Sequence, residues 1–334
     1  MKGEKMLKGL LRSARQVGVL VFALLGLLAT HLAMAQNFPS RPITIYTGFP
    51  PGGGNDAVAR VIGEQLSKTL KQSVIVDSKI GAGGEIANAF VGRSAPDGYT
   101  LFLAGNGSMS ISPVIHPDIP YDPMKFTPIG MVATAGAILV ARKDFPYHTV
   151  PEIVRYAKAN PGKLTFASSG IGAATHLAGE LFNEMAGIDI LHVPYKGASQ
   201  AVTDVIGGRV DFYYAASSAT ASIKSGQLRA IAVTSKDRLE DMPDIPPIGE
   251  YLPGYDFNYW YALFAPPGTP EAVARALSEA VAQALQVKAV QQQLAALELR
   301  PQDMRGAELR NFVASEIEKT RQIAKAANII RAAP

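Results

Sequence analysis

The sequence predicts an α/β protein in which short strands alternate with helices and form mainly parallel sheets. Helical patterns separate most of the expected strands; within 173–187, for example, Leu177, Leu181 and Met185 recur every four residues and share one helix face. Strands that alternate with helices of this size indicate βαβ units. The expected strands are runs rich in β-branched or aromatic residues: 43–47, 74–77, 100–103, 138–141, 164–167, 190–193, 210–214, 228–233 and 259–265.

The loop after the first of these strands carries the strongest motif of the chain. Strand 43–47 leads through Gly48 into Phe49-Pro50-Pro51-Gly52-Gly53-Gly54-Asn55-Asp56, and a helical pattern starts at Ala57. A strand, a glycine-rich turn and a helix N-terminus in this order expose backbone N–H groups to an anion, and glycine lets a ligand approach closely. No Gly-Lys-Ser/Thr follows, which excludes a nucleotide P-loop. The stretch therefore predicts a site for a small anion such as a carboxylate.

A second turn of the same kind follows the strand 164–167. Ser168-Ser169-Gly170-Ile171-Gly172 precedes Ala173-Ala174-Thr175-His176, where a helical pattern begins. Serine hydroxyls and backbone N–H groups both donate to carboxylates, and an exposed helix N-terminus favours negative charge by about 0.3–1 kcal/mol. Either turn alone has the pattern of an ordinary βα loop with helix capping. Two such turns, one in each expected domain, favour a ligand that is held from opposite sides.

Three further loops are candidates with a plainer alternative. Gly81-Ala82-Gly83-Gly84 lacks the Gly-x-Gly-x-x-Gly spacing, so we interpret it as a tight βα turn and not a dinucleotide loop. Gly105-Asn106-Gly107-Ser108 follows strand 100–103 and is either a third loop of the site or a simple turn. Tyr195-Lys196-Gly197-Ala198 follows strand 190–193, where Lys196 either steers an anion or is a solvated loop lysine.

The sequence gives little support for catalysis, metal binding or a cofactor. It has no cysteine, no His-Glu-x-x-His pair and no Gly-x-Ser-x-Gly elbow. His176 either contacts a ligand or caps and packs its helix, and Asp204 either binds a cation or amine or caps a helix. The alternative of an exported hydrolase would use Ser168 or Ser169 with His176.

The first 35 residues have the three parts of a secretory signal peptide. Five Lys or Arg residues precede an uncharged run at 17–30, and Ala33-Met34-Ala35 has the form of a cleavage site. The run is shorter than the roughly 20 residues of a spanning helix, which favours cleavage after Ala35 over a membrane anchor. The remaining chain has 27 basic and 27 acidic residues, because residues 1–35 contain five of the 32 basic and one of the 28 acidic ones. This balance argues against nucleic acid as a partner.

The order of patterns indicates one domain inserted into another. The chain enters a new βα series near Ala137-Ile138-Leu139-Val140 and leaves it near Pro253-Gly254-Tyr255. We expect two crossovers to form a hinge between a first lobe, 36–138 plus 256–334, and a second lobe, 139–255. The last helix is expected to bury a stripe of Leu309, Phe312, Val313 and Ile317.

These motifs together resemble the tripartite tricarboxylate transporter receptors, the extracytoplasmic solute-binding proteins also called Bug receptors. The resemblance covers essentially all of the chain after residue 38. It rests on the following segments in this order: Pro39-Ser40-Arg41-Pro42-Ile43, 49–56, 81–84, Ala95-Pro96-Asp97-Gly98-Tyr99-Thr100-Leu101, 168–170, Thr175-His176-Leu177-Ala178-Gly179-Glu180, His192-Val193-Pro194-Tyr195-Lys196-Gly197, Asp204, Gly207-Gly208 and Val210-Asp211.

The resemblance implies a two-lobed, type II periplasmic-binding fold that closes on a carboxylate. The first grip would be Phe49 to Asp56, and the opposing grip would be Ser168 to Gly170 with Thr175 and His176. The loops at Tyr195–Ala198 and Ser108 would line the cleft. Tyr213-Tyr214-Ala215-Ala216-Ser217 departs from the family, so the far end of the pocket is expected to be more aromatic or more open.

The resemblance also implies partners and a location. We expect a monomer in the periplasm that binds a small carboxylate and works with integral-membrane transporter subunits. A sensory receptor that presents the solute to a membrane signalling protein needs the same cleft, so the sequence does not separate the two roles.

Overall fold

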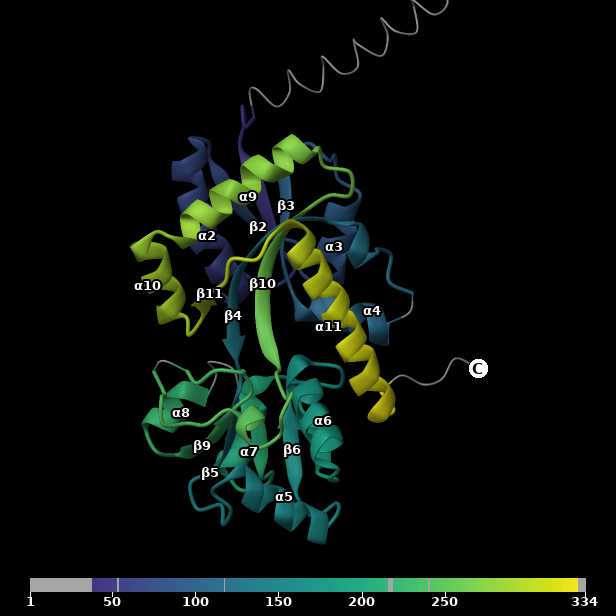
Figure 1. Ribbon diagram of the computed structural model, residues 1–334, viewed down its shortest axis with the longest axis vertical. Coiled ribbons are helices and arrows are strands. Elements are labelled where there is room, and N and C mark those ends of the chain that lie inside the picture. The colour runs from purple at the N-terminus through teal and green to yellow at the C-terminus, as the bar shows by residue number, and fades with distance from the viewer. Residues whose placement is uncertain (1–37, 53, 117, 216–218, 240, 330–334) are drawn as a thin grey trace, which may run out of the picture.

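The computed structural model describes residues 38–329 except 53, 117, 216–218 and 240, and it contains two α/β lobes, one above the other in Figure 1. The expected signal peptide lies outside the described residues, as do Gly53 of the first glycine turn and Ala216 and Ser217 of the departing loop. Among the described helices, none has both the length and the hydropathy needed to cross a bilayer.

The upper lobe is built on a six-stranded sheet with the order β11-β4-β10-β3-β1-β2. β1 pairs in parallel with β2 and β3, whereas β10 is antiparallel to both β3 and β4. Its strands are β1 (Ile43–Thr47), β2 (Val74–Ser78), β3 (Thr100–Gly105), β4 (Thr127–Gly136), β10 (Asn258–Ala265) and β11 (Arg300–Pro301). Its helices are α2 (Gly54–Leu70), α3 (Glu85–Gly92), α4 (Ser112–Ile115), α9 (Glu271–Leu285), α10 (Lys288–Ala296) and α11 (Gly306–Ala326). The fully buried Ile45, Ile62 and Leu277 show how α2 and α9 pack on this sheet.

The lower lobe is built on a five-stranded sheet with the order β7-β6-β8-β5-β9. β6 pairs in parallel with β7 and β8, and β5 is antiparallel to β8 and β9. Its strands are β5 (Ile138–Arg142), β6 (Thr165–Ser168), β7 (Leu191–Pro194), β8 (Phe212–Ala215) and β9 (Leu228–Val233). Its helices are α5 (Val150–Ala159), α6 (Ala174–Ala186), α7 (Ala198–Ile206) and α8 (Thr220–Lys224).

The predicted two-lobed α/β architecture is confirmed, although both sheets are mixed. β5 and β10 are reversed because the chain crosses between the lobes: β4 passes through Ala137 directly into β5, and β10 enters the upper sheet from the lower lobe. The two-residue β11 at the edge of the upper sheet is also antiparallel to β4. A strand that comes from the other lobe runs away from the gap between them, whereas β1, β3, β6 and β8 run towards it. The carboxyl ends of these four strands therefore meet at one gap, where α/β proteins bind ligands.

Helix α11 links the two lobes a third time. Leu309 and Val313, from its expected apolar stripe, are buried in the upper lobe, whereas Ile323 near its end is buried in the main core of the lower lobe. Figure 1 shows α11 running down beside α6, and these two helices are in contact. The sequence placed this helix with the first lobe only, because a stripe of apolar residues does not show which surfaces it covers.

Candidate functional site: a cleft between the lobes

A cavity of about 570 Å³ lies between the two lobes. The upper lobe lines it with the loops after β1, β2 and β3 and with part of β10, and the lower lobe lines it with the loop after β6. Both glycine-containing turns that the sequence singled out therefore face one shared space. The expected site residues that line it are Phe49, Asn55, Asn106, Ser108, Ser169 and Gly170.

The loop after β6 is shaped by hydrogen bonds that lie beneath the cavity. The fully buried Ser168 Oγ donates to the carbonyl of Gly170 at 2.9 Å and accepts from the Gly170 N–H at 3.1 Å. The N–H of Ser169 donates to Thr175 Oγ1 at 2.9 Å. Ser168 and Thr175 are thus supports of the loop, and Ser169 and Gly170 are the residues that they present to the cavity.

His176 supports the same loop. Its Nδ1 accepts a hydrogen bond from the N–H of Gly172 at 3.1 Å, so in the neutral ring the proton is on Nε2, which lies 3.4 Å from Glu180 Oε1. The side chain is buried and does not line the cavity. In this structure His176 packs beneath the loop, and a contact between His176 and a ligand stays a prediction.

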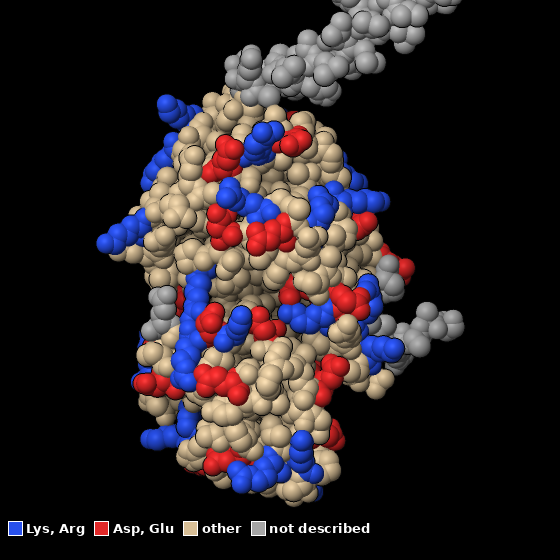
Figure 2. Space-filling model, viewed as in Figure 1, with Lys and Arg blue, Asp and Glu red and all other residues tan. Residues whose placement is uncertain are grey.

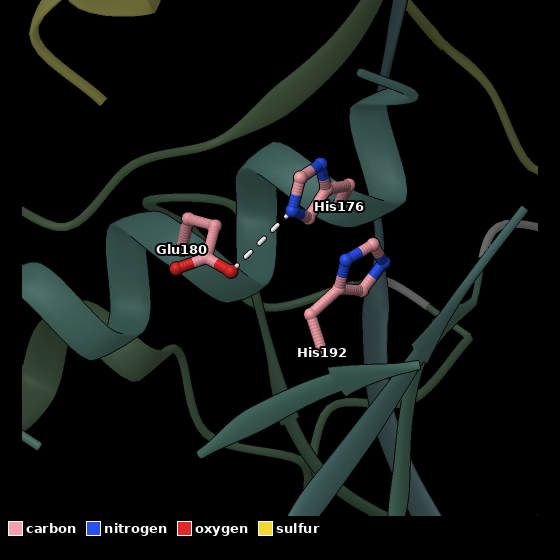
Figure 3. A group of neighbouring side chains, drawn as sticks. All are labelled: His176, Glu180 and His192. Carbon is pink, nitrogen blue, oxygen red and sulfur yellow. Dashed lines mark ion pairs between the residues drawn. The ribbon is translucent and has the colours of Figure 1, made fainter. Parts of the chain in front are cut away.

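His176, Glu180 and His192 form the group with metal-ligand geometry among the described residues, with ligand atoms within 4.8 Å of one another (Figure 3). The two imidazole rings are stacked with centroids 3.7 Å apart. Burial, followed by the neighbouring His176, lowers the pKa of His192 to about 4, so this ring is neutral at physiological pH.

The hydrogen bonds of this group argue against a metal ion. Because Nδ1 of His176 accepts from Gly172, its Nε2 carries a proton and has no lone pair for a metal. Nε2 of His192 lies 2.6 Å from Ser168 Oγ, which already donates to Gly170, so His192 is the donor. Nδ1 of His192 keeps a lone pair, but this nitrogen and Glu180 alone are fewer than the three or four protein ligands of a typical site. The group is therefore a hydrogen-bonded support that fixes the loop after β6.

The first glycine turn is held from below by Asp56. Its buried carboxylate accepts from the N–H of Gly52 and from Arg60 Nε, both at 2.9 Å. The hydrogen bond from Arg60 is the main cause that lowers the pKa of Asp56, against the effect of burial. Asp56 thus shapes the turn, and Gly54 lines a neighbouring hollow of about 420 Å³. Pro50 and Gly52 are exposed.

The segment after β3, which was expected as a loop and forms the π-helix Gly107–Ile111, is attached to the crossing strand β10 by Asn106. Its Nδ2 donates to the carbonyl of Asn258 at 2.8 Å, and its Oδ1 accepts from the N–H of Trp260 at 3.0 Å. The carbonyl of Ser108 accepts from Tyr121 at 2.6 Å and from Asn88 at 3.2 Å. The backbone of this loop is therefore fixed relative to both the hinge and the upper lobe.

Sequence reasoning missed the contribution of β10 to the cavity. Tyr259, Trp260 and Tyr261 line it, and burial raises the pKa of both tyrosines, which keeps their hydroxyls neutral. Ala82 and Gly83, which we interpreted as part of a tight turn, line it as well. The aromatic run 259–261 at the expected crossing predicted a strand. Which of its side chains face the cavity depends on how β10 pairs in the assembled sheet.

The loop after β7 is not brought to the cavity in this structure. The Tyr195 hydroxyl donates to Asp204 Oδ2 at 2.8 Å, and Arg209 lies 2.7 Å from the other Asp204 oxygen. These two contacts, in this order, lower the pKa of Asp204. Tyr195 and Asp204 line a separate hollow of about 390 Å³, and Lys196 is exposed. A ligand role for Tyr195, Lys196, Gly197, Ala198 and Asp204 stays a prediction.

The chain matches known proteins over most of its length. A family model described as a tripartite tricarboxylate transporter family receptor matches residues 58–329. A UPF0065 protein from the tcbD-tcbE intergenic region of Pseudomonas sp. (strain P51) is 36% identical over 299 residues, which cover 88% of this chain and 89% of that protein.

Two similar solved structures contain carboxylates. A protein from R. palustris with adipate is 30% identical, covers 87% of this chain and 98% of its own, and superposes with a TM-score of 0.74. The protein MatC from Rhodopseudomonas palustris with bound malate is 31% identical, covers 86% and 99%, and has a TM-score of 0.70.

Proposed function

Because the chain belongs to the tripartite tricarboxylate transporter receptor family, we propose that it captures a small organic carboxylate between its lobes and delivers it to integral-membrane transporter subunits. The observation that carries this proposal is the cavity that loops from both lobes line at the carboxyl ends of their strands. The adipate and malate in the two similar structures support a carboxylate as the ligand.

The site residues in this proposal divide into two groups. Ser169, Gly170, Asn106 and Ser108 form the surface that meets the ligand, with Phe49 and Asn55 of the first glycine turn. A second group holds these loops in place: Ser168, Thr175, His176 and Asp56. A ligand that touches both lobes stabilises the closed form over the open one, so binding proceeds as a population shift.

Receptor function without catalysis fits the serine and histidine geometry. A Ser–His pair does exist, between Ser168 and His192 at 2.6 Å. However, Ser168 is fully buried and its hydroxyl proton is directed to the Gly170 carbonyl. A nucleophile must reach the substrate, so this pair supports the loop and the chain acts as a binding protein.

The location and the lobe boundaries complete the proposal. The mature protein would begin at Gln36 after export to the periplasm and act as a monomer. The first lobe would comprise 36–138 with 256–334, and the second 139–255. Figure 2 shows acidic and basic side chains side by side over one face of the molecule, which fits a small-molecule receptor better than a nucleic-acid-binding protein.

The test is carboxylate binding by the purified protein and by a loop variant. A thermal-shift screen of organic acids should raise the unfolding temperature for at least one acid, because a ligand that binds the native state stabilises it. In calorimetry, Ser169→Ala should lower the affinity for that acid at least 10-fold, whereas Ser315→Ala on the exposed face of α11 should leave it unchanged. Equal affinity in both variants would refute the role of the loop after β6. A screen in which no acid stabilises the protein would refute the proposed function.

A further inference from the structure

The walls of the cavity indicate what the rest of the ligand looks like, and we propose that its preferred ligand is an aromatic monocarboxylate. This inference rests on the proposed function, since it assumes that a carboxylate enters the cleft. It concerns the part of the ligand that the backbone donors do not contact.

The cavity is walled largely by apolar and aromatic side chains. They come from the segments after β1, β3 and β6 and from strand β10: Phe49, Ile111, Ile115, Ile171, Tyr259 and Tyr261. Phe49 on the upper lobe and Ile171 on the lower lobe are large hydrophobic residues that are 37% and 72% exposed. An exposed apolar residue on each side of a cleft indicates a surface that a ligand or a closing movement covers. Flat rings pack well against such walls.

The charged groups at the cavity also favour a ligand with a single carboxylate. Among the described residues that line it, the ionisable groups other than tyrosine are Glu85 and His116, which contact each other at 2.6 Å. Neither Lys nor Arg is in that set. One carboxylate can be bound by backbone and hydroxyl donors, but a second would lose water against apolar walls without a cation to compensate. Glu85 would also repel it.

The neighbouring hollow of about 420 Å³ is the feature that would favour a competing ligand class, a long dicarboxylate. It shares Tyr259 and Tyr261 with the cavity and contains Arg300. A long dicarboxylate could reach that guanidinium from the cavity. In this structure Arg300 Nη2 donates to the Arg238 carbonyl, and Glu298 beside it bonds to Thr220 at 2.8 Å. Because Asp241 and Glu298 also line this hollow and would repel a second carboxylate, we favour the monocarboxylate.

Calorimetry with a matched ligand series separates these classes. The series is benzoate, phenylacetate, benzamide, terephthalate, malate and adipate, titrated into the full mature protein. We expect benzoate or phenylacetate to bind at least 10-fold more tightly than malate and adipate, and benzamide not to bind. Tighter binding of terephthalate, malate or adipate would overturn the inference and leave the proposed function standing. If none of the five acids binds but another acid stabilises the protein in the thermal-shift screen, only the inference fails; if no acid in that screen does, both fail.

Two wall variants test the apolar contacts directly. Phe49→Ser and Ile171→Ser should each lower the affinity ratio of the best aromatic acid over malate at least 5-fold. The matched control is Ile75→Ser, since Ile75 is 51% exposed on the edge strand β2 and does not line the cavity. An unchanged ratio in both wall variants, with folding verified by circular dichroism, would contradict the proposal.

Discussion

Removal of the Asn106 side chain should destabilise the whole protein, although the residue lies outside the sheet, directly before the π-helix Gly107–Ile111. Its amide group bonds to the carbonyl of Asn258 and the N–H of Trp260, and it is only 5% exposed. Asn106→Ala leaves the buried N–H of Trp260 and the half-buried carbonyl of Asn258 without this partner. Each unsatisfied group costs about 1–3 kcal/mol, so the free energy of unfolding should fall by roughly 2–6 kcal/mol. That is a large share of the roughly 5–15 kcal/mol that stabilises a typical native protein.

Urea denaturation followed by circular dichroism measures this loss. The matched control is Asn160→Ala, because the side-chain amide of Asn160 donates to the carbonyl of Tyr156, four residues earlier, at the end of α5. We expect this control to lose at most about 1 kcal/mol. Carboxylate affinity should also fall in the Asn106 variant, since the loop after β3 loses its attachment to β10. A loss of stability no larger than that of the control would refute the reasoning.

Three further predictions concern pH, a close backbone contact and export. The pKa of His192 is lowered from 6.5 to about 4, so between these pH values the unfolded chain binds a proton that the folded chain does not. The free energy of unfolding should therefore fall as the pH drops from 6.5 towards 4. His192→Gln should flatten this part of a plot of urea midpoint against pH, and an unchanged slope would contradict the role of His192. In Gly48→Ala the new Cβ would lie 2.3 Å from the Gly84 Cα, so we expect a lower melting temperature and weaker carboxylate binding, whereas Gly63→Ala, with ordinary contacts from 3.4 Å, should retain both. Intact mass of the exported protein should correspond to a chain that starts at Gln36, and a retained Met1 would contradict cleavage.

The sequence predicted the strands that are rich in β-branched and aromatic residues but missed β4. This ten-residue strand reads Thr-Pro-Ile-Gly-Met-Val-Ala-Thr-Ala-Gly, and its proline, glycines and alanines have low strand propensity. It forms because β10 pairs along its length and β11 pairs on its other side. Such long-range pairing is invisible to local pattern analysis, and so is the packing of Ile323 in the lower lobe.

The candidate site was predictable at the level of loops and less so at the level of side chains. Both glycine turns contribute residues to one cavity, because β1 and β6, which belong to separate sheets, both run towards the gap between the lobes. Within those loops the sequence could not tell Ser169, which faces the cavity, from Ser168, which is buried beneath it. The difference depends on which hydroxyl the turn directs back to its own backbone. Tyr259 and Tyr261 escaped prediction for a similar reason, since only the assembled sheet fixes their direction.

A crystal structure of the protein with its tightest organic acid tests the central claim most directly. We predict that one carboxylate lies between the lobes, within hydrogen-bond distance of donors in both the 49–56 turn and the 168–174 loop, directly or through one water. A carboxylate that contacts a single lobe, or that binds outside the 570 Å³ cavity, would contradict this account.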